Sequence, residues 1–148
     1  MIPPLSRVRW RRTYRLIRSI YPPIHLFEDI ADPAKWDAIA SGESKSNARV
    51  AASIGRLELV PPERRVGGAG SSYVMAPFVH ISARFQGRFH DGSFGAYYAA
   101  NRFETAVAET TFHRARLYAD TSERPGWFSQ FRELVGSIDA RVHDIRGR

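Results

Sequence analysis

The chain has 148 residues, of which 43% are hydrophobic and 25% are charged, and it contains no cysteine. These values predict one globular domain spanning residues 1–148, and they exclude disulfide frameworks, cysteine nucleophiles and thiolate metal sites. The sequence has no apolar run of about eighteen residues and no secretory signal pattern. We therefore expect a soluble, cytoplasmic protein.

The net charge is +7, and its basic side is almost wholly arginine because Lys35 and Lys45 are the only lysines. Arginine suits two-pronged recognition of phosphate or carboxylate, so an anionic partner fits this composition. A bias toward arginine can equally follow from coding composition, and charge alone does not decide the function. The five histidines have no ligand-like spacing, which predicts no metal site.

The first part of the chain predicts a strand followed by a helix. A basic segment, residues 1–13, leads into the alternating stretch 13–17, which is typical of a strand. Asp32 and Pro33 then predict a helix start, because aspartate caps helices and proline is favoured in the first turn. We expect this helix to end at residues 41–42.

The middle of the chain predicts loops and short strands. Polar residues 43–47 are expected to form a loop, and residues 56–60 a strand. The glycine-rich stretch 64–72 lacks the endings and spacing of phosphate-binding glycine loops, so a surface loop is expected there. Residues 72–85 predict one or two strands, interrupted by Pro77.

Residues 87–109 combine a glycine-punctuated loop, a predicted strand over 95–100 and a helix. Asn101, followed by Glu104 three residues later, predicts the cap of this helix, which we expect to run to about Leu117. Gly92 and Gly95 are expected to let the backbone approach a ligand closely.

A last strand is predicted over residues 132–140. Because strands outnumber helices and do not alternate with them regularly, we predict a mixed α+β domain.

Four polar residues stand out as candidates for chemistry. Glu109 has small or apolar helical neighbours, so it either faces a substrate hydroxyl or developing positive charge, or forms a buried ion pair with Arg15 or Arg88. Arg88 can leave a strand end toward an anion, and Arg15 has a defined direction in its strand; each can also be plain surface charge. Tyr98 or its neighbour Tyr97 can stack on a planar group or pack in the core.

Together these residues resemble the RES-domain family, the toxins of a bacterial toxin–antitoxin system, which are similar in fold to ADP-ribosyltransferases and consume NAD. The resemblance implies that Arg15, Arg88, Tyr98 and Glu109 occupy the family's NAD-site positions. It rests on three stretches in this order: TYRLIRSIYPPI, GRFHDGSFGAYYAA and ETAVAE.

The resemblance implies cleavage of the nicotinamide–ribose bond of NAD and transfer of ADP-ribose to a protein acceptor. With water as the acceptor the protein would be an NAD glycohydrolase, and with phosphate a phosphorylase. Glu109 would stabilise the sugar cation, and Tyr98 would stack on nicotinamide. Arg15 and Arg88 would hold the phosphates. An antitoxin that covers the NAD cleft is the implied partner.

Two parts of the chain depart from the family pattern. Residues 47–83 form an inserted stretch without an assigned role, and the family's late serine lies well beyond the glutamate. Ser137 comes too early for that serine and lies in a strand expected to be core, so the role is not carried over to it. An alternative of another class is a basic nucleic-acid-binding module, based on the arginine and aromatic mixture at residues 7–18.

Overall fold

The computed structural model describes residues 2–21, 28, 32–46, 52, 54–82, 87 and 89–146. Its contacts divide the chain into two compact units. The sheet unit comprises Met1–Tyr21 with Tyr98–Arg148, and the helical unit comprises Pro22–Tyr97.

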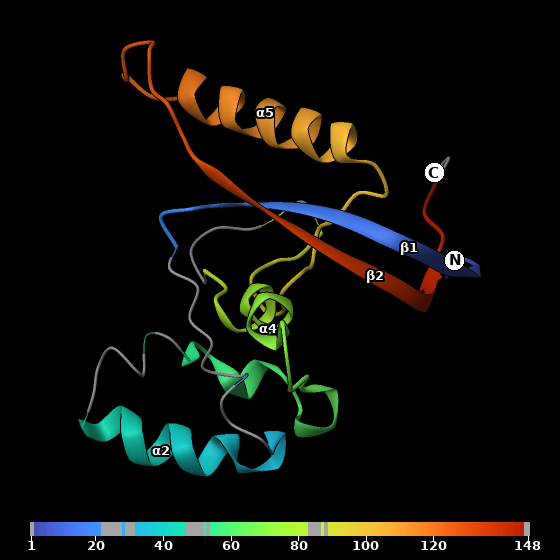
Figure 1. Ribbon diagram of the computed structural model, residues 1–148, viewed down its shortest axis with the longest axis vertical. Coiled ribbons are helices and arrows are strands. Elements are labelled where there is room, and N and C mark those ends of the chain that lie inside the picture. Colours follow the sequence, from blue (N-terminus) through green and yellow to red (C-terminus); the bar gives the residue numbers. More distant parts are fainter. Residues whose placement is uncertain are drawn as a thin grey trace. The chain divides into compact units, whose positions relative to one another are not determined.

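Two long antiparallel strands, β1 (Leu5–Arg18) and β2 (Phe131–His143), form the base of the sheet unit (Figure 1). The strands expected over 13–17 and 132–140 are therefore confirmed, and both are longer than predicted. The pairing shifts register between Trp10 and Thr13. Beyond this irregularity, buried Thr13 lies opposite Gly136, where an added Cβ would lie 3.4 Å from the Thr13 hydroxyl.

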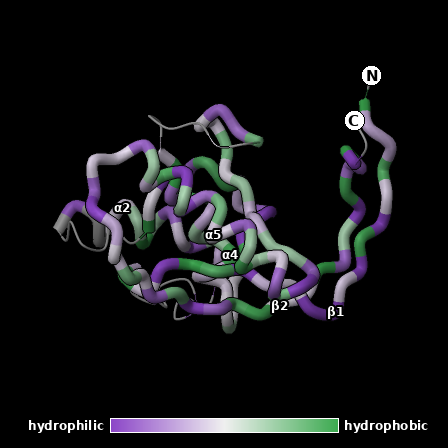
Figure 2. The backbone as a smooth tube through the Cα atoms, turned by 90° about the horizontal axis from the view of Figure 1, so that it is seen from above, coloured by the Kyte–Doolittle hydropathy of each residue, from purple (hydrophilic) through white to green (hydrophobic). Residues whose placement is uncertain are grey.

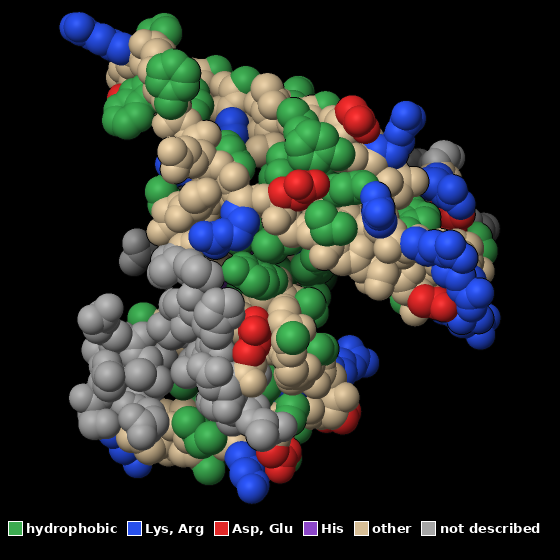
Figure 3. Space-filling model, in the orientation of Figure 1, with side chains coloured by type: hydrophobic (Ala, Val, Ile, Leu, Met, Phe, Trp, Pro, Cys, Tyr) green, Lys and Arg blue, Asp and Glu red, His purple; other side chains and the backbone are tan. Residues whose placement is uncertain are grey.

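Strands β1 and β2 form a two-stranded ribbon, and the end of this ribbon near the chain termini is strongly basic. Figure 3 shows cationic side chains, all of them arginines, gathered over this end of the sheet unit. Two of these charges share one carboxylate, because Arg7 Nε and Arg9 Nε lie 2.8 and 2.9 Å from the Asp139 carboxylate oxygens. The hydrogen bond from Arg7, supported by that from Arg9, holds the pKa of Asp139 below its ordinary value. These cations are thus partly neutralised within the ribbon.

Helix α5 (Phe103–Ala119) confirms the helix expected after Asn101. Its N-cap is Arg102, whose side chain makes no capping hydrogen bond, so the predicted Asn101 cap is wrong. The Phe103 ring meets Tyr14 of β1 edge-on, with the ring centroids 6.1 Å apart. This aromatic contact seats the start of α5 on β1.

The strand predicted over residues 95–100 is not formed. Ala100 makes one isolated bridge to Tyr14, in which Tyr14 N donates to Ala100 O at 2.7 Å and Ala100 N to Tyr14 O at 2.9 Å. Gly95 instead packs against the backbone of Pro77 within the helical unit. Residues 95–100 make tertiary contacts instead of pairing along a strand, so their local preference for a strand is not realised.

The first helix of the helical unit begins as predicted but continues further. Asp32 Oδ1 accepts a hydrogen bond from Ala34 N at 3.0 Å, which caps a 3₁₀ turn leading into α2 (Trp36–Ser46). The expected end at residues 41–42 and the expected loop over residues 43–46 are therefore wrong. A glycine such as Gly42 costs a helix only about 1 kcal/mol, which packing elsewhere along α2 offsets.

Helix α4 (Ser71–Val79) replaces the strands predicted over residues 72–79. Met75 and Val79, one helical turn apart, are both almost completely buried. Pro77 lies near the end of the helix, where it removes a single hydrogen bond of the backbone ladder. Residues 83–85 of the predicted strand lie outside the described residues.

The segment predicted as a strand over residues 56–60 contains a 3₁₀ helix, Leu57–Leu59, so that prediction is wrong as well. Its apolar side chains join one core with residues from α2 and α4. Figure 2 colours the backbone by the hydropathy of each residue. The core consists of Trp36, Ile54, Leu57, Val60, Met75 and Val79, with Ala40 and Phe78 packed against it.

Arg65 fastens the glycine-rich stretch to α2. Its side chain is only 3% exposed and makes a two-pronged pair with Asp37, at 3.0 and 2.9 Å, while its Nε donates to Val60 O at 3.0 Å. This arginine is therefore engaged in holding the helical unit together.

The described elements mix helices with a small antiparallel sheet, which confirms the α+β class. The single domain and the ADP-ribosyltransferase-like arrangement stay predictions. None of the helices in the described ranges has the length and apolar character that crossing a bilayer would require.

Candidate functional site

Arg15 and Tyr98 meet in the sheet unit. Arg15 lies on β1, and its Nη1 donates a hydrogen bond of 3.1 Å to the backbone carbonyl oxygen of Tyr98. Both residues are half-buried. A long, flexible side chain is thereby held in one direction beside a tyrosine that lies 83 residues away in the sequence.

Glu109 lies near the middle of α5, as predicted, and its side chain is 38% exposed. Its Oε1 is 3.9 Å from His113 Nε2, one helical turn further on, which makes an ion pair when that histidine is protonated. An ion pair of Glu109 with Arg15 or Arg88 stays a prediction. A half-exposed carboxylate of this kind can stabilise positive charge on a bound molecule.

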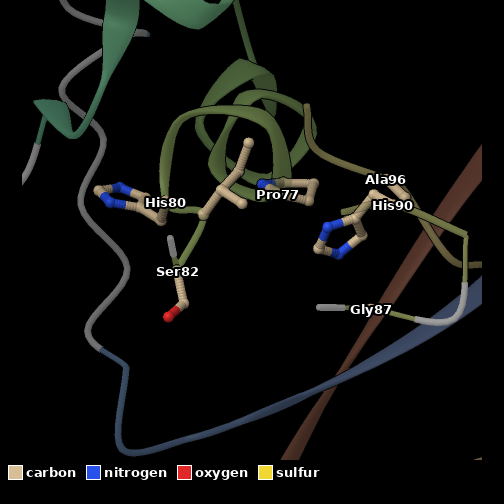
Figure 4. A pocket seen from close by; sticks show the side chains of 7 residues that line it. Pro77, His80, Ser82, Gly87, His90 and Ala96 are labelled. Atoms are coloured by element: carbon tan, nitrogen blue, oxygen red, sulfur yellow. The ribbon is translucent and has the colours of Figure 1, made fainter. Parts of the chain in front are cut away.

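Arg88 lies outside the described residues, whereas Gly87, the residue before it, is described. Gly87 N donates a 2.9 Å hydrogen bond to His90 O, which closes a tight turn at this point. Beside Gly87 the helical unit contains a cavity of about 250 Å³. Figure 4 shows the His90 ring extending toward Gly87, with His80 and Ser82 elsewhere around the cavity. The lining residues are Pro77, His80, Ile81, Ser82, Gly87, His90 and Ala96.

The His90 ring is fixed by its neighbours. Its Nδ1 accepts a hydrogen bond from Gly92 N at 3.2 Å, so the neutral ring carries its proton on Nε2. Phe94 contacts the ring edge-on, with centroids 6.1 Å apart. An added Cβ at Gly87 would lie 2.1 Å from His90 Nε2, so the ring packs directly over the glycine.

Gly95 has a packing role that differs from the one expected. An added Cβ at this position would lie 2.1 Å from the Pro77 carbonyl oxygen. The close approach that Gly95 permits is therefore to the chain's own backbone at the end of α4. This contact holds the loop against the helix and so shapes the cavity.

Replacing Gly95 with alanine is expected to destabilise the protein by about 1–3 kcal/mol, because the new methyl group would overlap a backbone atom. The matched change Gly42→Ala is expected to stabilise it by about 0.5–1 kcal/mol, since nothing lies within 4 Å of that site on helix α2. Urea unfolding of both variants measures the two effects. Equal stability of the two would contradict this packing.

The sequence did not single out the polar residues of the cavity. His80 and His90 are ten positions apart, and no spacing rule joins them. Their proximity to one cavity depends on the glycine contact with Pro77, which is tertiary. In the described part of the chain, no three His, Asp or Glu side chains are grouped to hold a metal ion.

Comparison with known proteins places the chain in a family. The model of the RES domain matches residues 62–148, which include Gly87 and Glu109 but begin after Arg15. The uncharacterized protein y4oC of Sinorhizobium fredii (strain NBRC 101917 / NGR234) is 32% identical over 133 residues, covering 90% of this chain and 56% of the relative. The chain thus spans little more than half the length of that relative, and no solved structure matches it. On the extent of the RES-domain match, the chain belongs to the RES-domain family.

Proposed function

We propose that this protein consumes NAD by cleaving the bond between nicotinamide and ribose, and that it transfers ADP-ribose to a protein acceptor. The RES domain is a family associated with NAD-related toxin function. The observation that carries the proposal to this chain is the hydrogen bond between Arg15 and the Tyr98 carbonyl. It joins two of the four residues that the resemblance assigns to NAD.

In the proposed reaction, the electron pair of the nicotinamide–ribose bond leaves with nicotinamide, and the ribose becomes cationic. The carboxylate of Glu109 stabilises that charge, either directly or through a ribose hydroxyl. Nicotinamide is a neutral leaving group once the bond breaks, so no general acid is needed. The acceptor oxygen or nitrogen then forms a bond to the sugar carbon and releases its proton.

Binding must hold the reacting sugar in place. We assign stacking on nicotinamide to the Tyr98 ring and phosphate binding to Arg15 and Arg88. The bond from Arg15 to the Tyr98 backbone supports this assignment, because it fixes the guanidinium relative to the tyrosine before the substrate arrives.

Incubation of the purified protein with cell extract and NAD labelled in its adenylate part tests which acceptor is used. A labelled protein band is the expected result. Free ADP-ribose without a labelled band would replace the transferase with a glycohydrolase, and phosphate-dependent formation of a phosphorylated ADP-ribose would replace it with a phosphorylase. The same incubation with Glu104→Gln, which changes an exposed glutamate of α5, is the matched control and should give the same labelled band as the wild-type protein.

A protein antitoxin that covers the NAD cleft is the proposed partner. The association of the family with toxin function supports this assignment, and the net charge of +7 suits an acidic partner element. Nucleic acid is the weaker alternative, because Arg7 and Arg9 of the basic ribbon already share the Asp139 carboxylate.

A further inference from the structure

One end of the sheet unit brings together the last turn of α5, the end of β1 and the segment that precedes β2. Ser19 N donates a 3.0 Å hydrogen bond to Gln130 O, which ties the end of β1 to that segment. Arg18 is the last residue of β1 and pairs with Phe131. Ser129, next to Gln130, is thereby held close to Arg18.

Tyr118 stands at the centre of this region. Arg114, one turn earlier on α5, donates a 3.0 Å hydrogen bond from Nη2 to the Tyr118 hydroxyl, and its Cζ lies 5.0 Å from the centre of the tyrosine ring. The Ser129 hydroxyl, followed by the charges of Arg114 and Arg18, lowers the pKa of Tyr118. The phenol oxygen is thus surrounded by donors and positive charge.

The two arginines have buried donors that nothing in the described part of the chain satisfies. Arg18 Nε and Arg114 Nε are both enclosed and have no hydrogen-bond partner there. Ion pairs with carboxylates are made by other arginines, such as Arg7, Arg9 and Arg65. Two neighbouring guanidinium groups repel each other, and buried polar groups normally have partners. A bound anion would offset this repulsion and accept hydrogen bonds from the enclosed donors.

Stabilisation of the C-terminal end of α5 explains only part of this arrangement of arginines. A cation near a helix C-terminus interacts favourably with the helix dipole, and Arg114 lies in the penultimate turn of α5. Stacking on Tyr118 likewise gives Arg114 a local role. Arg18, however, comes from the strand β1, and neither effect accounts for its enclosed Nε.

We propose that Arg18, Arg114 and Tyr118, with Ser129, form an anion site that binds a phosphate group. Guanidinium and hydroxyl donors are the groups that hold phosphate oxygens most strongly in proteins. Tyr118 lies nine residues from Glu109 on α5, about 14 Å along the helix axis at 1.5 Å per residue. The site is therefore separate from Glu109 and does not depend on the NAD chemistry proposed above.

Binding of inorganic phosphate to the intact protein, followed by isothermal calorimetry against chloride at matched ionic strength, tests this site. We expect wild-type protein to bind phosphate and the Kd to rise at least about tenfold in Arg18→Gln and in Arg114→Gln, because each loses a charge-assisted hydrogen bond. Arg116→Gln, an exposed arginine of the same helix, should leave the Kd unchanged.

Tyr118→Phe keeps the ring under Arg114 but removes the hydroxyl, so it weakens phosphate binding without emptying the helix end. Unchanged phosphate binding in Arg18→Gln and Tyr118→Phe, or no binding beyond that of chloride, would overturn the proposal. A competition arm with ADP-ribose identifies the source of the phosphate: displacement assigns the site to a nucleotide, and independent binding assigns it to free phosphate. None of these measurements uses NAD turnover, so their failure is distinct from failure of the proposed function.

Discussion

We expect replacement of Glu109 with glutamine to lower the rate of nicotinamide release from NAD by about 100-fold or more, the size of effect seen when a group that stabilises transition-state charge is removed. Glutamine has the shape of glutamate but no charge, so it cannot stabilise the cationic ribose. The fold should survive, because the carboxylate is 38% exposed and glutamine has nearly the same size and shape.

The rate is measured with purified protein, and thermal unfolding is recorded beside it. Glu104→Gln serves as the control because it removes the same charge from an exposed position in the first turn of α5. If the Glu109 variant released nicotinamide at the wild-type rate while remaining folded, the role assigned to this carboxylate would be wrong.

We expect replacement of Arg15 with lysine to lower kcat/KM for NAD by roughly 100-fold, because a lysine cannot reproduce the planar fork of donors and a small misplacement of a substrate-binding group is costly. The positive charge is kept, so a loss reports geometry and not net charge. The variant also loses the 3.1 Å hydrogen bond to the Tyr98 carbonyl. That bond contributes about 1.5–3 kcal/mol to stability by the usual range for charged donors.

Initial rates over a range of NAD concentrations separate the two consequences. An increase in KM reports weaker phosphate binding, whereas a lower kcat reports a misplaced Tyr98. Arg12→Lys, at an exposed position in the irregular part of the same strand, is the control. A wild-type kcat/KM in the Arg15 variant would remove this residue from the site.

Elements whose signals are local were predicted well. The alternation around Tyr14 and the apolar and polar pattern before Ala140 located β1 and β2, and Asp32 marked the start of its helix. Helix α4 was misread, because its β-branched and aromatic residues favour strands by local propensity and Pro77 disfavours the interior of a helix. The helix forms because Met75 and Val79 bury themselves against Trp36 and Leu57, a tertiary gain that no local pattern contains.

The candidate site was only partly accessible to the same reasoning. The order and spacing of its motifs led to the RES-domain family, and through it to Arg15, Tyr98 and Glu109. The hydrogen bond between Arg15 and the Tyr98 carbonyl spans 83 residues, so local periodicity could not reveal it. The cavity beside His90 depends on the contact between Gly95 and the Pro77 carbonyl, which follows from packing alone.

Release of nicotinamide from NAD by the purified wild-type protein is the most direct test that this RES domain consumes NAD. We predict release that grows with time and with protein concentration, and that greatly slows in the Glu109→Gln variant. Absence of nicotinamide release, from protein whose cooperative unfolding shows that it is folded and whose melting temperature NAD does not raise, would contradict the proposed function.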